Sequence, residues 1–218
     1  MNDPFNRPAA ISLAEALERT GDRLVLAESC TAGLVAASLA RIPGISQRLT
    51  GSAVAYQEVT KTQWLHISPE TLQSDGVVSA AVAEQMAHGA LNRTPHATLA
   101  ASVTGHLGPD APSDLDGVVW SAVAVREDGA IRCTVRQLPV DGNASPDETD
   151  IHRRHRRQIE AARQLMLFCQ QRVECITDES VPDSLSRDVQ RGKSLRWRVS
   201  SIRKIPAIRS DTLAGERT

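Results

Sequence analysis

The feature that most constrains this chain is a short apolar run that passes through a polar turn into a helix. Leu24–Ala27 has the length of a strand, residues 28–33 are mostly polar or small, and apolar residues then recur at helical spacing over 34–40. A strand followed directly by a helix is the repeating unit of sheets covered by helices. In parallel α/β sheets, ligands bind at such turns, where strand ends meet exposed helix N–H groups. The sequence therefore predicts an α/β fold with a site just after Ala27.

The same alternation continues along the chain. Apolar runs predict further strands at 51–56, 96–103, 118–125 and 131–138. A first helix is expected between a capping box, Ser12 with Glu15, and the stop at Gly21. Other helices are expected at 34–40, 59–65 and 151–169. Two more are expected to begin at residue 68 and just after residue 79. These elements predict a single domain over residues 10–172, folded as a three-layer α/β/α sandwich.

The segment 173–218 has a different composition. It is rich in serine, arginine and proline and has few periodic apolar residues, which predicts a basic, flexible C-terminal tail. Gly192-Lys193-Ser194 is similar to the end of a phosphate-binding loop, but Arg187 stands where that motif needs its first glycine. We therefore expect a solvated tail without a nucleotide site and without a nucleic-acid or membrane partner.

Composition excludes several other classes of protein. A hydrophobic content of 41% and a net charge of −1 are typical of a globular domain and give no reason to expect nucleic-acid binding. No apolar run reaches the roughly 18 residues of a membrane span, and residues 1–8 lack a signal peptide's apolar stretch. The four cysteines have no metal-binding spacing. We expect a cytoplasmic protein with reduced thiols and without a metal or cofactor.

Ser29 and Lys61 are the candidate reacting residues. A serine at a strand-to-helix turn has an exposed hydroxyl and neighbouring N–H groups, but it needs a base. No Ser-His-Asp set is apparent, since only His106 lies in a candidate site loop. A lysine with a lowered pKa can take the serine proton, and Tyr56 can relay it. The residues alone leave open that Ser29 only caps a helix and that Lys61 is solvated.

The segment 27–34, AESCTAGL, resembles the AESCTGG signature of the CinA C-terminal domain, the nicotinamide-nucleotide amidohydrolase family. Further matches follow in the family's order over roughly residues 10–170 and include 43–46, 56–61, 70–72, 76–79, 104–109 and 117–118. The resemblance implies the same three-layer fold, chemistry without a metal or cofactor, and a homo-oligomer.

The resemblance also implies the reaction, which is deamidation of nicotinamide mononucleotide to nicotinate mononucleotide and ammonia. Ser29 would be the nucleophile, Lys61 the general base, and Tyr56 would assist proton transfer. Arg156 or Arg157 would contact the phosphate. The remaining expected substrate-binding residues are Glu28, Cys30, Thr31, Ala32, Gly33, Ser46, Thr104, Gly105 and Gly108.

The chain departs from the family pattern in its loops. Ala32 replaces a glycine, Glu58 stands where asparagine is usual, His106 interrupts the TGIAGP loop, and residues 114–116 are Asp-Leu-Asp. Acidic residues there would repel a phosphate unless a cation neutralises them. Two alternatives therefore stay open, a non-catalytic member that binds a nucleotide or a protein, and an amidase with another small substrate. A thiol nucleophile at Cys30 is a weaker alternative, because a small cysteine beside a strand is usually buried.

Overall fold

The computed structural model describes residues 5–141 and 147–179, with side chains described as far as residue 175. Five strands form one sheet in the order β2-β1-β3-β4-β5. Their bounds are β1 Leu24–Glu28, β2 Leu49–Val54, β3 Leu99–Gly105, β4 Val119–Glu127 and β5 Ala130–Gln137. β1 pairs in parallel with β2 and β3, whereas β4 is antiparallel to β3 and forms the expected hairpin with β5. All five predicted strands are present.

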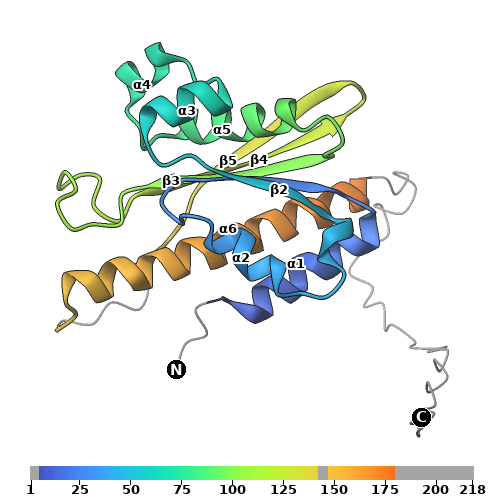
Figure 1. Ribbon diagram of the computed structural model, residues 1–218, viewed down its shortest axis with the longest axis horizontal. Coiled ribbons are helices and arrows are strands. Elements are labelled where there is room, and N and C mark those ends of the chain that lie inside the picture. The colour runs from blue at the N-terminus through green and yellow to red at the C-terminus, as the bar shows by residue number, and fades with distance from the viewer. Residues whose placement is uncertain (1–4, 142–146, 180–218) are drawn as a thin grey trace, which may run out of the picture. The chain divides into compact units, whose positions relative to one another are not determined.

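Helices cover both faces of this sheet, which confirms the three-layer α/β/α sandwich. α1, α2 and α6 lie on one face and α3, α4 and α5 on the other (Figure 1). Their bounds are α1 Arg7–Thr20, α2 Leu34–Ala40, α3 Glu58–Leu65, α4 Pro69–Asp75, α5 Ala80–Arg93 and α6 Asp150–Glu179, and a short 3₁₀ helix, η1, spans Ile45–Gln47. Ser68 and Ser79 cap α4 and α5 by accepting hydrogen bonds from N–H groups of the first turn, as the sequence predicts.

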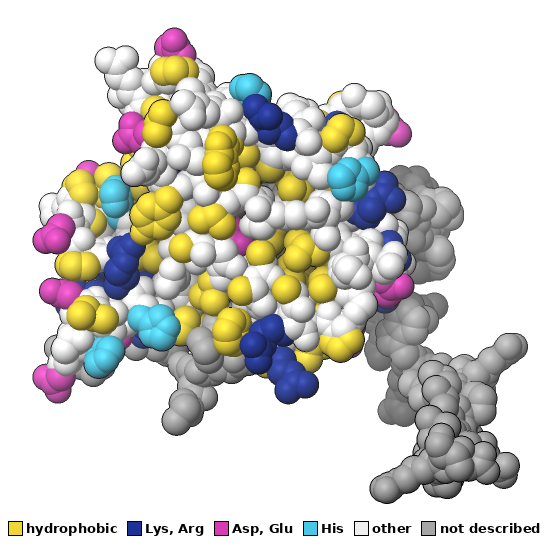
Figure 2. Space-filling model, viewed as in Figure 1, with side chains coloured by type: hydrophobic (Ala, Val, Ile, Leu, Met, Phe, Trp, Pro, Cys, Tyr) yellow, Lys and Arg dark blue, Asp and Glu magenta, His cyan; other side chains and the backbone are white. Residues whose placement is uncertain are grey.

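Each face of the sheet has its own aliphatic core. β1 is buried throughout, because helices cover it on both sides, and its side chains enter the two cores alternately: Leu24 and Leu26 enter one, and Val25 and Ala27 enter the other. Burial of one leucine contributes about 1.5–3 kcal/mol. Apolar side chains also remain on the surface, spread over the middle of the face in Figure 2, and the exposed large ones are Val54, Tyr56, Val59, Trp64 and Ile151.

The first helix begins earlier than the sequence indicates. α1 starts at Arg7, so Ser12 and Glu15 lie inside the helix and do not form its capping box. Asn6 is the N-cap residue, with a left-handed φ of 47° and no capping hydrogen bond from its side chain. Its amide instead donates to the carbonyl of Ile159 in α6, at 2.9 Å. A tertiary contact therefore holds this end of the helix, and Pro8 in the first turn is the local signal for the earlier start.

The last helix continues beyond its predicted end at Cys169. α6 runs to Glu179, and Val173 is fully buried in the core that contains residues of both α1 and α6. The expected tail therefore cannot start at 173, because that residue belongs to the packed helix. Residues 180–218 lie outside the described residues. Among the described helices, none is both long enough and apolar enough to cross a membrane.

Candidate active site

The turn after β1 is held by the buried carboxylate of Glu28. Its oxygens accept hydrogen bonds from the N–H groups of Val35 at 3.0 Å and Ala36 at 2.9 Å, which belong to the first turn of α2. The hydroxyls of Thr31 and Ser52 also donate to it, at 2.8 and 3.2 Å. A carboxylate at a helix N-terminus satisfies N–H groups that have no partner within the helix. Glu28, expected among the substrate-binding residues, is therefore placed as the anchor of the turn.

Ser29 and Lys61 are in direct contact. The Nζ atom of Lys61 donates hydrogen bonds to Ser29 Oγ at 2.8 Å and to the main-chain carbonyl of Tyr56 at 3.1 Å. Both residues are buried, with 6% of Ser29 and 2% of Lys61 exposed. The N–H of Ser29 donates to the carbonyl of Val103 in β3, which fixes the serine at the carboxyl end of β1. The distance is within the reach that a nucleophile and its base require.

The surroundings of Lys61 make its amine easier to deprotonate than that of a lysine in water. Burial lowers the pKa of its amine, although the nearby Cys30 and Glu58 oppose part of this shift. Among the described residues Lys61 forms no ion pair with a carboxylate. Burial has the opposite effect on the thiol of Cys30 and raises its pKa to about 12. At neutral pH that thiol is protonated and is a poor nucleophile.

A cleft of about 570 Å³ opens onto the serine and the lysine. It is lined by Ser29, Cys30, Tyr56, Gln57, Glu58, Val59, Lys61, Val77, Val78, Thr104, Gly105, His106, Leu107, Gly108, Pro109, Asp110, Ala111 and Arg154. Most of these residues come from three loops, after β1, after β2 and after β3. The structure therefore brings together Ser29, Cys30, Tyr56, Lys61, Thr104, Gly105 and Gly108 from the predicted site.

The wall after β3 has structural constraints of its own. The Thr104 hydroxyl donates to the carbonyl of Val77 at 2.8 Å, so it joins two parts of the cleft wall. A Cβ on Gly105 would lie 2.7 Å from a side-chain carbon of Val119 and 2.9 Å from the carbonyl of Val118. Glycine is needed here for close pairing with β4, not only for the approach of a ligand that the sequence suggests.

Arg154 is a cleft residue that the sequence analysis did not select. Its guanidinium donates to the carbonyl of Gly108 at 2.5 Å and to the hydroxyl of Tyr56 at 2.6 Å, so it bridges two loops of the cleft. One helical turn further along α6, the amide of Gln158 donates to the carbonyls of Cys30 and Thr31. The i, i+4 spacing of Arg154 and Gln158 is the signal that could have indicated this face of α6.

The two arginines expected to contact phosphate do not line the cleft. Arg157 directs all of its N–H groups at the carboxylates of Asp116 and Asp141 and at the carbonyl of Leu107. Arg156 binds Glu148 and Asp141. Helical periodicity explains this for Arg156, which is rotated by about 200° from Arg154. Arg157 is only about 60° from Arg154 around the helix, and its hydrogen bonds to the two carboxylates hold it away from the cleft lining. The acidic loop residue Asp116 is thus paired with Arg157.

Four other expected residues also lie outside the cleft lining. Thr31, Ala32 and Gly33 form the turn into α2, where Ala32 and Gly33 have left-handed φ values of 53° and 90°. Ser46 is exposed in η1, and η1 leads into Arg48, whose carbonyl accepts from the N–H of Leu24 at the start of β1. Ser46 is thus near the opposite end of β1 from Ser29, because α2 carries the chain back along the strand.

The hydroxyl of Tyr56 is turned toward Arg154, while its main-chain carbonyl contacts Lys61. The tyrosine side chain is half exposed. Its part in proton transfer stays a prediction.

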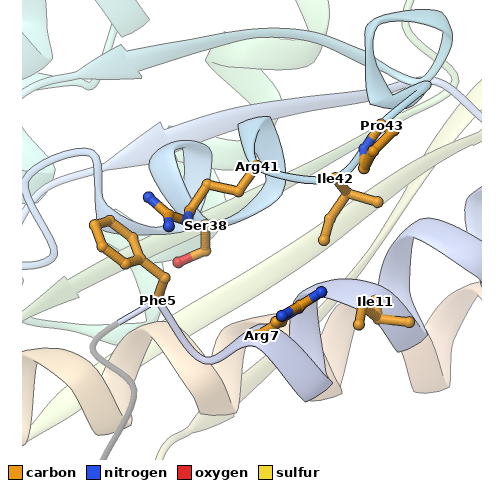
Figure 3. Close-up of a pocket in the computed structure, with 7 residues that line it drawn as sticks. All are labelled: Phe5, Arg7, Ile11, Ser38, Arg41, Ile42 and Pro43. Atoms are coloured by element: carbon orange, nitrogen blue, oxygen red, sulfur yellow. The ribbon is translucent and has the colours of Figure 1, made fainter.

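A larger hollow of about 730 Å³ lies at α1 and α2 (Figure 3). Its lining includes Phe5, Arg41 and Ser38, and the Arg41 guanidinium stacks 4.3 Å from the centre of the Phe5 ring. The Ser38 hydroxyl donates to the carbonyl of Leu34 within α2. The described residues that line this hollow include no lysine, histidine or carboxylate, so Ser38 has no base there. The candidate active site is therefore the cleft at Ser29.

Comparison with known protein families supports this fold and the identity of the turn after β1. The family model of the CinA C-terminal domain matches residues 6–148. The chain belongs to the CinA C-terminal domain family. A CinA-like protein of Myxococcus xanthus (strain DK1622) is 41% identical over 118 residues, which make up 53% of this chain and 28% of that protein. A CinA-like protein of Mycobacterium tuberculosis (strain H37Rv) is 41% identical over 128 residues, 58% of this chain and 29% of that protein.

Solved CinA structures have the same fold over most of the described chain. The competence damage-inducible protein A (ComA) of Klebsiella pneumoniae matches with a TM-score of 0.65 and 25% identity, over 78% of this chain and 97% of that one. The competence/damage inducible protein CihA of Agrobacterium tumefaciens matches with a TM-score of 0.61 and 28% identity, over 82% and 96%. The CinA-like proteins named above are longer, and this chain spans less than a third of their length.

Proposed function

We propose that this CinA-family chain hydrolyses the carboxamide of nicotinamide mononucleotide to nicotinate mononucleotide and ammonia. The observation that carries the proposal is the 2.8 Å contact between Ser29 Oγ and Lys61 Nζ at the base of the cleft. The likeness to the nicotinamide-nucleotide amidohydrolase family supports the choice of substrate.

In the first half of the reaction, Ser29 Oγ attacks the carboxamide carbon while its proton passes to the neutral amine of Lys61. A C–O bond forms, and the carbonyl oxygen takes the negative charge. The N–H of Ser29 already donates to Val103, so an oxyanion needs another donor, and the N–H of Cys30 is the nearest along the chain. The Lys61 ammonium then gives its proton to the departing nitrogen. The C–N bond breaks, and ammonia leaves an ester on Ser29.

In the second half, water hydrolyses that ester. Lys61, neutral again, takes a proton from the attacking water, and the protonated lysine returns a proton to Ser29 Oγ as the carboxylic acid product leaves. An amide is a poor electrophile, and the covalent intermediate divides its hydrolysis into two easier steps. A buried lysine suits both halves, because burial lowers the pKa of its amine and so makes the neutral form, which accepts a proton, more accessible.

Arg154 is our candidate for the phosphate of the substrate, since its guanidinium lines the cleft and matches phosphate geometry. The charge of the cleft also favours a second candidate function. Glu58 and Asp110 line the same cleft as Lys61 and Arg154, so the lining has no excess of positive charge. That balance suits an amidase whose small carboxamide substrate carries no phosphate.

The test is ammonia release by the purified full chain from three substrates, nicotinamide mononucleotide, nicotinamide riboside and nicotinamide. We expect the mononucleotide to give the highest kcat/KM. The Ser29→Ala variant should lose at least about 10³-fold of that activity. Cys30→Ala is the matched control at the neighbouring position, and it should retain the ammonia release that depends on Ser29.

Faster release from the riboside than from the mononucleotide would favour the second candidate. Binding of the mononucleotide without ammonia release from any substrate would instead support a non-catalytic nucleotide-binding member. Activity that survives in Ser29→Ala but is lost in Cys30→Ala would overturn the assigned nucleophile.

A further inference from the structure

Three metal-binding side chains meet on the sheet face that α5 covers. Glu84 and His88 lie one turn apart on α5, and Cys133 lies on β5, which α5 crosses (Figure 1). Their ligand atoms, a carboxylate oxygen, an imidazole nitrogen and the thiol sulfur, all lie within 4.8 Å of one another. None of the three residues lines the cleft at Ser29.

These three groups have no other partners in the part of the chain that the structure describes. No hydrogen bond or ion pair of Glu84, His88 or Cys133 side chains occurs there. His88 and Cys133 are half buried, while Glu84 is exposed and gives access from solvent. A divalent cation at this point would give all three side chains a partner.

The ligand set favours one class of ion. Thiolate and imidazole bind zinc and similar divalent transition metals, whereas magnesium and calcium prefer oxygen ligands. Zn–S bonds of about 2.3 Å and Zn–N bonds of about 2.0–2.1 Å place tetrahedral ligand atoms roughly 3.3–3.7 Å apart. The observed cluster therefore has to contract by only about 1 Å, which side-chain rotation can supply.

We propose that Glu84, His88 and Cys133 bind a divalent transition-metal ion of the zinc class, with water as the fourth ligand. The ion joins α5 to β5, which is an edge strand of the sheet. Its role is structural, because the three ligands are separate from the serine and lysine of the cleft. The site could not be recognised from the sequence, since Cys133 is far from Glu84 and His88 along the chain and no metal-binding motif includes all three.

The test uses untagged full-length protein that has been treated with a chelator. Titration with Co²⁺ should give a thiolate-to-cobalt charge-transfer band in the near ultraviolet with a stoichiometry of one. Zn²⁺ at roughly 100 times its Kd should raise the Tm by roughly 5–10 °C. It should also protect Cys133 from alkylation, as read by peptide mass spectrometry.

Cys133→Ser and His88→Gln should remove the Co²⁺ band and the Tm shift. Cys175→Ser and His96→Gln are matched controls at exposed positions elsewhere, and both should keep them. The alkylation readout uses wild-type protein and so remains valid if a variant folds poorly. Absence of the band from wild-type protein, or equal alkylation of Cys133 with and without Zn²⁺, would overturn the proposal.

Discussion

Lys61 and Arg157 are both cationic side chains taken almost completely out of water, yet their surroundings differ. Arg157 contacts two carboxylates, those of Asp116 and Asp141, at 2.7–3.0 Å. Among the described residues, the Lys61 amine donates hydrogen bonds only to a hydroxyl and a carbonyl. The hydrogen bonds with Asp116 raise the pKa of Arg157, whereas burial lowers the pKa of Lys61.

The contrast shows how one fold assigns two roles to buried positive charge. A cation with carboxylate partners stays charged, and Arg157 thereby ties the loop after β3 to the segment after β5. A cation without such partners loses its proton more readily, and in our proposal Lys61 is the base for the buried hydroxyl of Ser29 beside it. Both residues thus contribute to the walls of the cleft, but only the pKa of Lys61 is lowered, whereas that of Arg157 is raised.

The largest expected effect follows from removal of the Lys61 amine. Lys61→Met should lower kcat/KM for nicotinamide mononucleotide by at least about 10³-fold. In wild-type protein the rate should rise with pH through the lowered pKa of Lys61, because only the neutral amine accepts the serine proton. Steady-state kinetics across pH would measure this. Lys61→Arg, which keeps the charge but cannot deprotonate, should be equally inactive; an active arginine variant would contradict the role of base.

Loss of Arg157 should reduce stability. Arg157→Met leaves two partly exposed carboxylates without a cation, and we expect a loss of about 1–2 kcal/mol in the free energy of unfolding, measured by urea denaturation. Adding Asp116→Asn and Asp141→Asn should recover part of that loss. A cost below about 1 kcal/mol for Arg157→Met would mean that the cluster does not hold the cleft wall.

The same cluster should make stability sensitive to acid, with a smaller effect. Hydrogen bonds from Arg157 lower the pKa of Asp116; burial alone would raise that of Asp141, but Arg157 and Arg156 outweigh it and lower it as well. Their stabilising contribution is present above the unfolded-state pKa of about 4 and is lost as pH falls toward the lowered folded-state values. Urea midpoints between pH 5 and 2.5 should therefore fall less steeply in Arg157→Met than in wild-type protein.

The smallest expected effect concerns the third cation, Arg154. Arg154→Met should raise KM for nicotinamide mononucleotide about tenfold, equivalent to about 1.4 kcal/mol, with little change in kcat. Kinetics with nicotinamide riboside provide the control, because that substrate has no phosphate for Arg154 to contact. An equal loss with both substrates would assign Arg154 to loop positioning through Tyr56 and Gly108 instead.

Local patterns predicted most of the fold because turns and caps mark the elements clearly. Ser68, Ser79 and the Asp128–Gly129 turn each act as the sequence indicates. One error arose at the start of α1, where Pro8 in the first turn and the contact of Asn6 with α6 place the helix end before Ser12. In the site, the turn after β1 led to Ser29 and the family resemblance to its pairing with Lys61, but neither could show that Arg154, and not Arg156 or Arg157, lines the cleft. The rotation of α6 turns Arg156 away from the cleft, and the carboxylates of Asp116 and Asp141 engage Arg157.

The length of α6 sets the smallest unit of this chain that can fold by itself. The family match ends at residue 148, yet α6 begins at Asp150 and contributes Arg154 to the cleft and Leu165 and Val173 to the core. A fragment confined to residues 6–148 would expose the apolar surface of α1 and lose one side of the cleft. The autonomous folding unit therefore includes α6 and is longer than the segment by which the family is recognised.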